Sequence, residues 1–364
     1  MSISGSPTKE QVIDILRQVN DPELHRDLVS LNMIKNVAVC DGNVRVAVEL
    51  TTPACPLKDK VREDVLAAVR KLPGVANVEV EFSARVRSSP FKQAMLPGVK
   101  NVLAVGAGKG GVGKSTLSVL TAVGLARAGA RVGLLDADVY GPSIPKMLGV
   151  ENARPKVAGE NKIIPIVAQD LKLMSVGFLI EPERAVVVRG PMAHGLIRDF
   201  LEKVEWGDLD YLIVDLPPGT GDVPLTLSQS LPLNGAVVVC TPQEVALLDA
   251  VRAARMYQML NVEVLGIVEN MSYFIAPDTG KEYDLFGKGG AEKAAARLKV
   301  PFLGSIPINV AIRKSGDEGN PAEIFEKDPQ GVGAAVQKVV ENLAGQISIR
   351  NESRAAPVEL NIHR

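Results

Sequence analysis

The residues from Gly108 to Thr116 carry the clearest chemical signal in the sequence. They match the spacing G-x-x-x-x-G-K-[ST], follow a short apolar run and precede a segment with helical periodicity. Glycines at this spacing allow the backbone to fold tightly and to turn its N–H groups toward phosphate oxygens at a helix N-terminus. The sequence therefore predicts a phosphate-binding loop formed by Gly108, Gly110, Gly111, Val112, Gly113, Lys114, Ser115 and Thr116.

Three side chains of this loop have the chemistry to hold nucleotide phosphates. Lys114 is expected to reach the β- and γ-phosphates, and Ser115 to bind Mg²⁺ through its hydroxyl. A second lysine, Lys109, makes the loop more specific than the general motif, although a solvated surface lysine is the alternative interpretation. The loop thus predicts that the chain binds a nucleoside triphosphate together with magnesium.

Carboxylates stand at the ends of two predicted strands. Asp136 and Asp138 end one apolar run, and Asp215 ends another, before a segment rich in Pro and Gly. In a doubly wound sheet the carboxyl ends of the strands face the ligand crevice, where a carboxylate can orient water or hold Mg²⁺ through water. Asp136 and Asp215 are therefore candidate magnesium residues. Capping or turn formation is the alternative for all three aspartates.

The elements that must position these residues begin at Lys100. Short apolar runs there alternate with helical segments, which is typical of a mostly parallel sheet covered by helices on both faces. The predicted strands cover residues 101–106, 131–136, 171–176, 211–215, 235–240, 264–270 and 301–306. The predicted helices cover residues 114–128, 194–204, 244–260, 291–298 and 331–344. The expected fold class is α/β, with a doubly wound, mostly parallel sheet.

Residues 8–82 form a separate, small α/β domain in this prediction. Helical periodicity at 11–19 and 59–71 alternates with strand-like runs at 34–40, 44–50 and 75–82. Asp41-Gly42 between the first two runs favours a hairpin turn. The mixed segment 83–99 predicts a linker, 100–347 the second domain, and 348–364 a polar tail.

Composition narrows the functional classes. The formal net charge of the 364 residues is −1, and aromatic residues make up 4%. The composition therefore gives no sign of a basic surface or a base-stacking surface, and it argues against a nucleic acid partner. No apolar run approaches the roughly 20 residues needed to cross a membrane, and the N-terminus lacks the apolar core of a secretory signal. Three scattered cysteines, Cys40, Cys55 and Cys240, indicate a reducing, cytoplasmic compartment.

The loop with two lysines resembles the deviant Walker A class that includes MinD, ArsA and the nitrogenase iron protein. In that class the first lysine crosses a dimer interface, so the resemblance implies that Lys109 acts in trans within a homodimer. It also implies that Asp138 positions the attacking water and that Asp215 is the Walker B aspartate. Lys109, Lys114 and Asp138 would then be the catalytic residues of an ATPase.

Two residues outside the loop complete the nucleotide site that this resemblance implies. Asn270 would pair with the adenine edge, since its amide offers both a donor and an acceptor. Pro307 would pack against the base. A turn-forming role is about equally natural for both residues.

Five segments extend the resemblance to one family. They are Gly108–Thr116, Asp136–Ser143, Arg189–Met192, Asp215–Asp222 and Glu269–Phe274. Together they are similar to the Mrp/ApbC iron–sulfur cluster carriers over residues 100–345. The N-terminal segment resembles the MIP18-like domain often fused to them, through Asp21-Pro22-Glu23 and Thr52–Pro56. The resemblance implies slow, magnesium-dependent ATP hydrolysis and delivery of iron–sulfur clusters to apoproteins.

The sequence departs from that family at its metal ligands. The family continues the Glu269–Phe274 segment into a Cys-x-x-Cys pair that binds a bridging cluster, whereas this chain has Ala276 and Thr279 at those positions. Thiolates are the usual iron–sulfur ligands, so whether a cluster is bound stays open. Cys55, in a Pro-flanked loop before a predicted helix, is the candidate ligand that remains, with a buried structural cysteine as an equal alternative.

Three functions are therefore compared. The first is an ATP-dependent carrier that works as a homodimer on apoproteins or assembly scaffolds. The second is an ATP-gated adaptor or regulator of cluster assembly that holds no cluster itself, which would explain intact ATPase motifs beside missing thiolates. The third, a MinD/ParA-type positioning ATPase, ranks low because the C-terminal segment lacks a basic amphipathic face.

Overall fold

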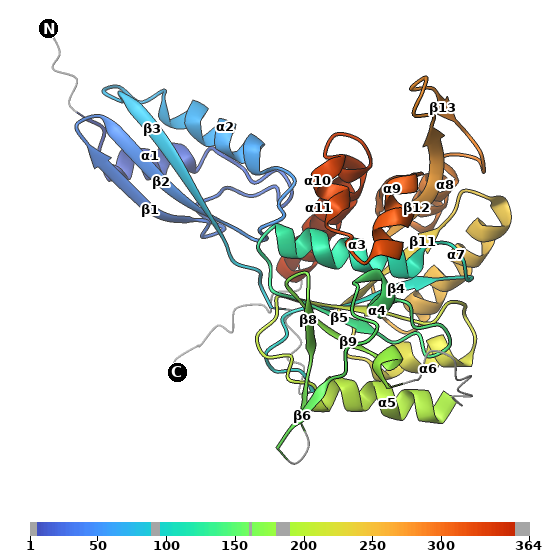
Figure 1. Cartoon of the computed structure of the whole chain (residues 1–364). Helices are drawn as coiled ribbons and strands as arrows, with labels where there is room; N and C mark the ends of the chain where they lie inside the picture. The colour runs from blue at the N-terminus through green and yellow to red at the C-terminus, as the bar shows by residue number, and fades with distance from the viewer. Residues whose placement is uncertain (1–5, 89–94, 160–161, 180–189, 354–364) are drawn as a thin grey trace, which may run out of the picture. The chain divides into compact units, whose positions relative to one another are not determined.

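The computed structural model describes residues 6–88, 95–159, 162–179 and 190–353 (Figure 1). The chain divides into two compact units, one comprising Met1–Pro90 and Ala344–Arg364 and the other Phe91–Leu343. Parts of three sequence predictions lie outside the described residues, namely 89–94 of the linker, Arg189 of one family segment, and 354–364 of the tail.

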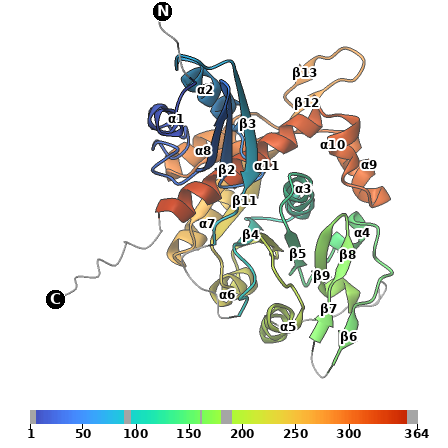
Figure 2. The same ribbon diagram turned by 90° about the vertical axis from the view of Figure 1, so that its left-hand side faces the viewer.

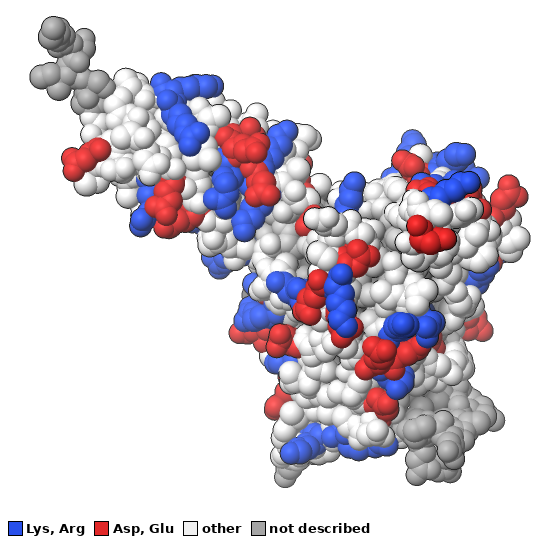
Figure 3. All heavy atoms as spheres, turned by 45° about the horizontal axis from the view of Figure 1, so that its top comes forward, with Lys and Arg blue, Asp and Glu red and all other residues white. Residues whose placement is uncertain are grey.

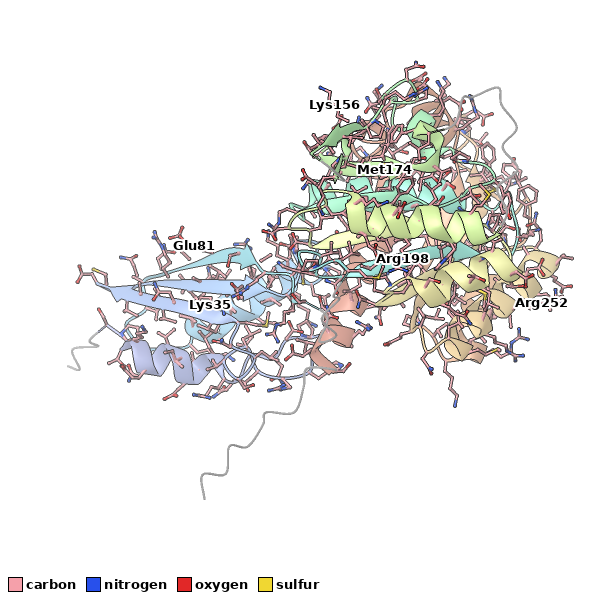
Figure 4. The ribbon with its side chains drawn as sticks, turned by 90° about the horizontal axis from the view of Figure 1, so that it is seen from below. Lys35, Glu81, Lys156, Met174, Arg198 and Arg252 are labelled. Atoms are coloured by element: carbon pink, nitrogen blue, oxygen red, sulfur yellow. The ribbon has the colours of Figure 1, made fainter. Side chains whose placement is uncertain are left out.

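The N-terminal part of the smaller unit, residues 6–88, contains a three-stranded sheet with two helices. In chain order its elements are α1 (Lys9–Leu16), β1 (Ile34–Cys40), β2 (Asn43–Leu50), α2 (Lys58–Val69) and β3 (Asn77–Ala84). β1 and β2 are antiparallel, and β2 and β3 are parallel. Alternate residues of β2 are buried, so one face of the sheet packs on the core. The opposite face carries charged residues, among them the labelled Lys35 and Glu81 (Figure 4). The predicted α/β domain is confirmed.

The turn between β1 and β2 follows from its two residues. Cys40 pairs with Asn43, which leaves a two-residue connection of Asp41 and Gly42. Both have positive φ, 47° and 78°, the backbone conformation that tight hairpins require and that Asp-Gly adopts readily. The predicted hairpin is confirmed.

The larger unit is built on a sheet of nine strands. These strands are β4 (Val102–Ala107), β5 (Val132–Asp136), β8 (Ile166–Ala168), β9 (Leu171–Ser175), β10 (Tyr211–Asp215), β11 (Gly235–Cys240), β12 (Val264–Ile275), β13 (Glu282–Tyr283) and β14 (Phe302–Ile308). Their order is β13-β12-β11-β4-β10-β5-β9-β8, with β14 also paired to β12. All pairs are parallel except β8 with β9 and β12 with β13, and a separate pair joins β6 (Lys156–Ala158) to β7 (Lys162–Ile164).

Helices cover both faces of this sheet, as a doubly wound fold requires. The longer ones are α3 (Lys114–Arg127), α5 (Gly190–Lys203), α6 (Asp222–Ser230), α7 (Glu244–Met259), α8 (Gly290–Leu298), α9 (Val310–Glu318) and α11 (Val332–Ser353). Short turns are α4 (Ile144–Met147), η1 (Val176–Phe178) and α10 (Glu323–Lys327). α3 lies on one face, and α5 and α6 lie together on the other (Figures 1 and 2). Figure 4 looks onto that second face and shows α5 with Arg198 and α7 with Arg252. The predicted fold class is confirmed.

α5 begins at Gly190, four residues before its predicted start, and two other elements continue beyond their predicted ends. β12 continues past Asn270 to Ile275 because it gains a partner, β13, in a hairpin. The last helix runs to Ser353 instead of ending at Ala344, so residues 348–353 are helical and not part of a polar tail. Its polar side chains find partners there, since Ser348 Oγ donates to Ala344 O and Asn351 Nδ2 donates to Arg87 O.

Charges on the surface are mixed in both units. Basic and acidic side chains alternate over the face shown in Figure 3, and many form exposed ion pairs such as Arg45 with Glu79. Among the helices of the described residues, no span is both long and apolar enough to cross a membrane.

Candidate phosphate-binding site

The buried side chain of Lys114 is the centre of the candidate site. It is the first residue of α3 and is 6% exposed. Its Nζ lies 2.7 Å from Asp215 Oδ2 and 3.4 Å from Asp138 Oδ2. The strand order explains this convergence, because β10 lies between β4 and β5 and all three strands end at the same edge of the sheet.

Two serine hydroxyls complete the hydrogen bonding of Asp215. Ser115 Oγ donates to its Oδ2 at 2.6 Å, and Ser118 Oγ donates to its Oδ1 at 2.6 Å. Ser115 was predicted from the motif, whereas Ser118 was missed. The signal that could have found Ser118 is its spacing, since residues four apart on a helix share a face and Ser118 follows Lys114 at that interval.

Asp136 is completely buried behind this cluster. Its carboxyl accepts hydrogen bonds from Ser175 Oγ at 2.9 Å and from the backbone N–H groups of Asp138 and Ile144. Burial, together with the nearby charge of Asp215, raises the pKa of Asp136 to about 8. Ser175 was not predicted either, and only its place at the end of β9 could have suggested it.

The charges of the cluster do not balance within the protein. Lys114 pairs with two of three buried aspartates, Asp138 and Asp215, and Asp136 has no ion pair among the described residues. A hard divalent cation suits oxygen donors such as these and the hydroxyl of Ser115. In the described part of the chain, no group of three or more His, Cys, Asp or Glu side chains could hold a metal ion by itself. The donor set therefore fits Mg²⁺ shared with phosphate and water.

The loop itself has the backbone conformation that its glycines allow. Gly111 and Gly113 have φ of 80° and 85°. A Cβ on Gly113 would lie 2.1 Å from Asn270 Nδ2, so only glycine permits this close approach. Asn270 Nδ2 donates to Val112 O at 2.8 Å, which places the predicted base-binding asparagine directly against the loop.

The remaining predicted site residues are placed as follows. Pro307 is buried in β14, whose Ile306 pairs with Asn270 of β12. Thr116 and Lys109 are both half-buried. Within the described ranges, Lys109 takes part in none of the ion pairs found, whereas Lys114 takes part in two.

None of the three cysteines has a contact with the aspartate cluster among the hydrogen bonds and ion pairs of the described residues. Cys55 is half-buried and packs against the core of the smaller unit. Cys240 is 1% exposed at the end of β11, where burial raises the pKa of its thiol to about 12. Ala276 and Thr279 lie in the turn between β12 and β13 and bring no sulfur to it.

A glycine-rich loop between a central parallel strand and a helix, with acidic strand ends beside its lysine, defines a P-loop NTPase. The family model of the NUBPL iron-transfer P-loop NTPases matches residues 98–344, and this chain belongs to that family. A second model, described as iron–sulfur cluster assembly protein, matches residues 9–82.

Individual relatives agree with this assignment. An iron–sulfur cluster carrier protein of Synechocystis is 50% identical over 350 residues, covering 94% of this chain and 98% of the relative. A nucleotide-binding protein from Archaeoglobus fulgidus, solved in complex with ADP, is 44% identical with a TM-score of 0.56, covering 62% of this chain and 89% of that one. The cell division ATPase MinD of Pyrococcus furiosus, at 22% identity and a TM-score of 0.51 over 67% of this chain and 98% of MinD, shares the fold.

Proposed function

We propose that the chain binds ATP with Mg²⁺ at the loop and hydrolyses it slowly. The observation that carries this proposal is the cluster in which buried Lys114 pairs with Asp138 and Asp215, with Asp136 buried behind them. The backbone N–H groups of Gly108–Thr116 and the ammonium of Lys114 would hold the phosphates. Ser115 would bind the metal directly, and Asp136 and Asp215 would hold it through water. When bound, the metal would neutralise charge on the phosphate oxygens.

The side chains of the chain itself suggest how hydrolysis is organised. Lys114 now shares its ammonium between Asp215 and Asp138, so phosphate oxygens would compete with these carboxylates for it. Asp138 would then be released to orient a water molecule toward the terminal phosphoryl group. Lys109, half-buried and outside the ion pairs of the described residues, would reach the nucleotide of a second copy in an ATP-dependent homodimer.

We further propose that the cargo of this ATPase is an iron–sulfur cluster delivered to apoproteins in the cytoplasm. Support comes from the family to which the chain belongs and from the curated relative named as a cluster carrier over almost its full length. The matched assembly domain at residues 9–82 would serve as a docking module for apoproteins or scaffolds. ATP binding and hydrolysis would close and loosen the dimer, and so retain and release the cargo.

The cluster cannot be held in the family's manner at the β12–β13 turn, because Ala276 and Thr279 are not ligands for iron. Cys55 is the proposed cargo ligand, since Cys240 is buried with a raised thiol pKa. The same turn also favours a second candidate function. A chain with an intact phosphate site and no thiolates at that turn could act as an ATP-gated adaptor that holds apoproteins or scaffolds without a cluster.

Anaerobic reconstitution with iron and sulfide separates these functions. Wild type, Cys55→Ser and the matched control Cys40→Ser, an exposed cysteine of the same unit, are compared by iron and sulfide content per dimer. Iron and sulfide bound by wild type and Cys40→Ser but not by Cys55→Ser support the carrier with Cys55 as ligand. Their absence from all three proteins, with ATP hydrolysis intact, contradicts the carrier and supports the adaptor.

A further inference from the structure

Glu269 is a fully buried carboxylate for which the nucleotide chemistry has no use. It lies in β12 and is 0% exposed. Its Oε1 accepts hydrogen bonds from Ser272 Oγ at 2.5 Å and from the Gly289 backbone N–H at 2.9 Å. Its Oε2 accepts from the Ala291 backbone N–H at 2.8 Å. Among the described residues, no cationic side chain forms an ion pair with this buried carboxylate, and its three donors show which segments it holds together.

The three donors lie at or next to the two ends of residues 271–289, a segment that we call the excursion. Ser272 lies at its beginning, and Gly289 and Ala291 lie at its end, where α8 starts. Between them the chain runs out along β12 and returns through β13. Glu269 therefore closes the base of the excursion 271–289, which includes the turn with Ala276 and Thr279.

The backbone at this base departs from regular strand geometry. Met271 has φ of 54°, a left-handed conformation that is costly for a side chain of its size. The register of β12 against β14 shifts between Asn270 and Phe274. Such strain persists only where surrounding contacts enforce it. The hydrogen bond from Ser272 to Glu269 spans this kink.

The neighbour of Glu269 in the strand touches the phosphate loop. Asn270 donates to Val112 O at 2.8 Å and is 8% exposed. Two consecutive residues thus point to opposite faces of one strand, one holding the loop and the other holding the base of the excursion. Because they share a peptide unit in a tightly packed strand, a displacement of one side displaces the other.

We propose that Glu269 is a positioning residue that couples the phosphate loop to the excursion 271–289. Nucleotide bound in the loop restricts the positions of Val112 and Asn270. Glu269 then restricts both ends of the excursion through its hydrogen bonds. The coupling is reciprocal, so whatever binds the excursion changes nucleotide affinity by the same factor. This inference rests on the proposed nucleotide binding. It means that nucleotide influences the excursion even though Ala276 and Thr279 stand there in place of cysteines.

Amide hydrogen exchange of the full-length protein, with and without saturating ADP and Mg²⁺, tests this coupling. In wild type we expect ADP to slow exchange within residues 276–288 by about 5-fold or more. Glu269→Gln keeps the acceptor for Ser272 and Gly289 but turns an NH₂ group toward the Ala291 N–H. We expect this variant to bind ADP with nearly unchanged affinity and to lose the slowing. A slowing in Glu269→Gln equal to that of wild type would overturn the proposal.

Two further variants keep the test decisive. Glu282→Gln removes an exposed carboxylate that pairs with Lys288 in the same excursion, and we expect it to retain the full effect of ADP. If Glu269→Gln does not fold, Ser272→Ala replaces it, and an undiminished effect of ADP in that variant would equally reject the coupling. ADP affinity is measured separately by calorimetry. A wild type that binds no ADP contradicts the proposed function, whereas one that binds ADP without any slowing at 276–288 contradicts the coupling alone.

Discussion

Lys114 and the aspartates around it show how the site depends on single charges. In the described part of the chain, Asp138 and Asp215 have Lys114 as their ion-pair partner, and Asp136 lies buried behind them. Like charges at this spacing and burial repel one another unless a cation intervenes. In the proposed site the ammonium therefore has two roles, to stabilise the aspartate cluster without ligand and to bind phosphate when nucleotide is present.

Replacing Lys114 tests both roles. Lys114→Ala leaves Asp138 and Asp215 without their cation, so we expect the unfolding free energy to fall by about 3 kcal/mol. ATP hydrolysis is expected to fall by about 100-fold or more, because the phosphate clamp is lost. Urea unfolding and phosphate release measure the two effects. Lys146→Ala, an exposed lysine paired with Glu151, is the control and should change neither. Wild-type hydrolysis in Lys114→Ala would contradict the proposed site.

Asp136 predicts a pH dependence of stability. Its pKa is raised from 3.8 to about 8 in the folded protein, by burial and by Asp215. As pH rises through this window the unfolded chain releases a proton that the folded chain keeps, so this residue makes the unfolding free energy decrease with increasing pH. This decrease in the unfolding free energy is absent below pH 3.8 and complete above about pH 8.

The variant Asp136→Asn removes this titration. We expect the difference in unfolding free energy between wild type and variant to shift in favour of the variant as pH rises from 5 to 8, measured by urea unfolding without nucleotide or Mg²⁺. Asp199→Asn, at a half-buried position of α5 that pairs with Lys203, serves as the control with no such drift. A difference that is constant across this range would show that Asp136 is ionised in the folded protein.

At the scale of elements, the strand that leads into the loop is packed tightly against α7. The hydroxyl of buried Tyr257 lies against Gly106 of β4, and a Cβ on Gly106 would be 2.1 Å from the Tyr257 oxygen. The side chain of Ser228, near the end of α6, lies beside the same hydroxyl. α6 begins directly after the Pro-Gly segment that follows Asp215. This contact therefore ties three elements of the site together.

A double-mutant cycle tests this packing. Gly106→Ala forces a methyl group into the tyrosine oxygen, and we expect a loss of about 2 kcal/mol. Tyr257→Phe alone should cost about 1 kcal/mol, because the buried hydroxyl loses its polar contact with Ser228. The double variant should be less destabilised than the sum, because the phenylalanine removes the oxygen in conflict. Strict additivity in urea unfolding would contradict the contact. Gly195→Ala, with open space at its Cβ, should be neutral or stabilising.

At the scale of the whole molecule, the proposed homodimer allows the roles of Lys109 and Lys114 to be tested separately. Lys109→Ala should leave nucleotide affinity within about 3-fold, since its role lies across the dimer, yet abolish ATP-dependent dimerisation and most hydrolysis. Sedimentation velocity with ATP or ADP measures the assembly. Lys100→Ala, whose side chain pairs with Asp210 away from the loop, is the control and should dimerise as wild type does. A variant Lys109→Ala that still dimerises with ATP would contradict action in trans.

Most of the regular structure followed from local patterns in the sequence. β10 and β11 have the bounds that their apolar runs predicted, because a strand buried on both faces needs an uninterrupted apolar run. α6 and α9 were missed, since their apolar periodicity is interrupted by Pro224 and by polar residues of α9. The sequence prediction ended the final helix at Ala344 because its last turns are polar. These polar side chains gain their hydrogen-bond partners only in the folded unit.

The sequence by itself determined the phosphate loop, the aspartates at strand ends and the fold class, because each depends on residue type and spacing along a few neighbouring residues. Only the tertiary structure decided that Ser118 and Ser175 complete the carboxylate cluster, that Asp136 is buried enough to raise its pKa, and that Glu269 holds an excursion closed. Hydrogen bonds between residues far apart in the chain, and the removal of water from a charge, are set by which strands become neighbours. That choice is a property of the whole packed sheet and leaves no local signal.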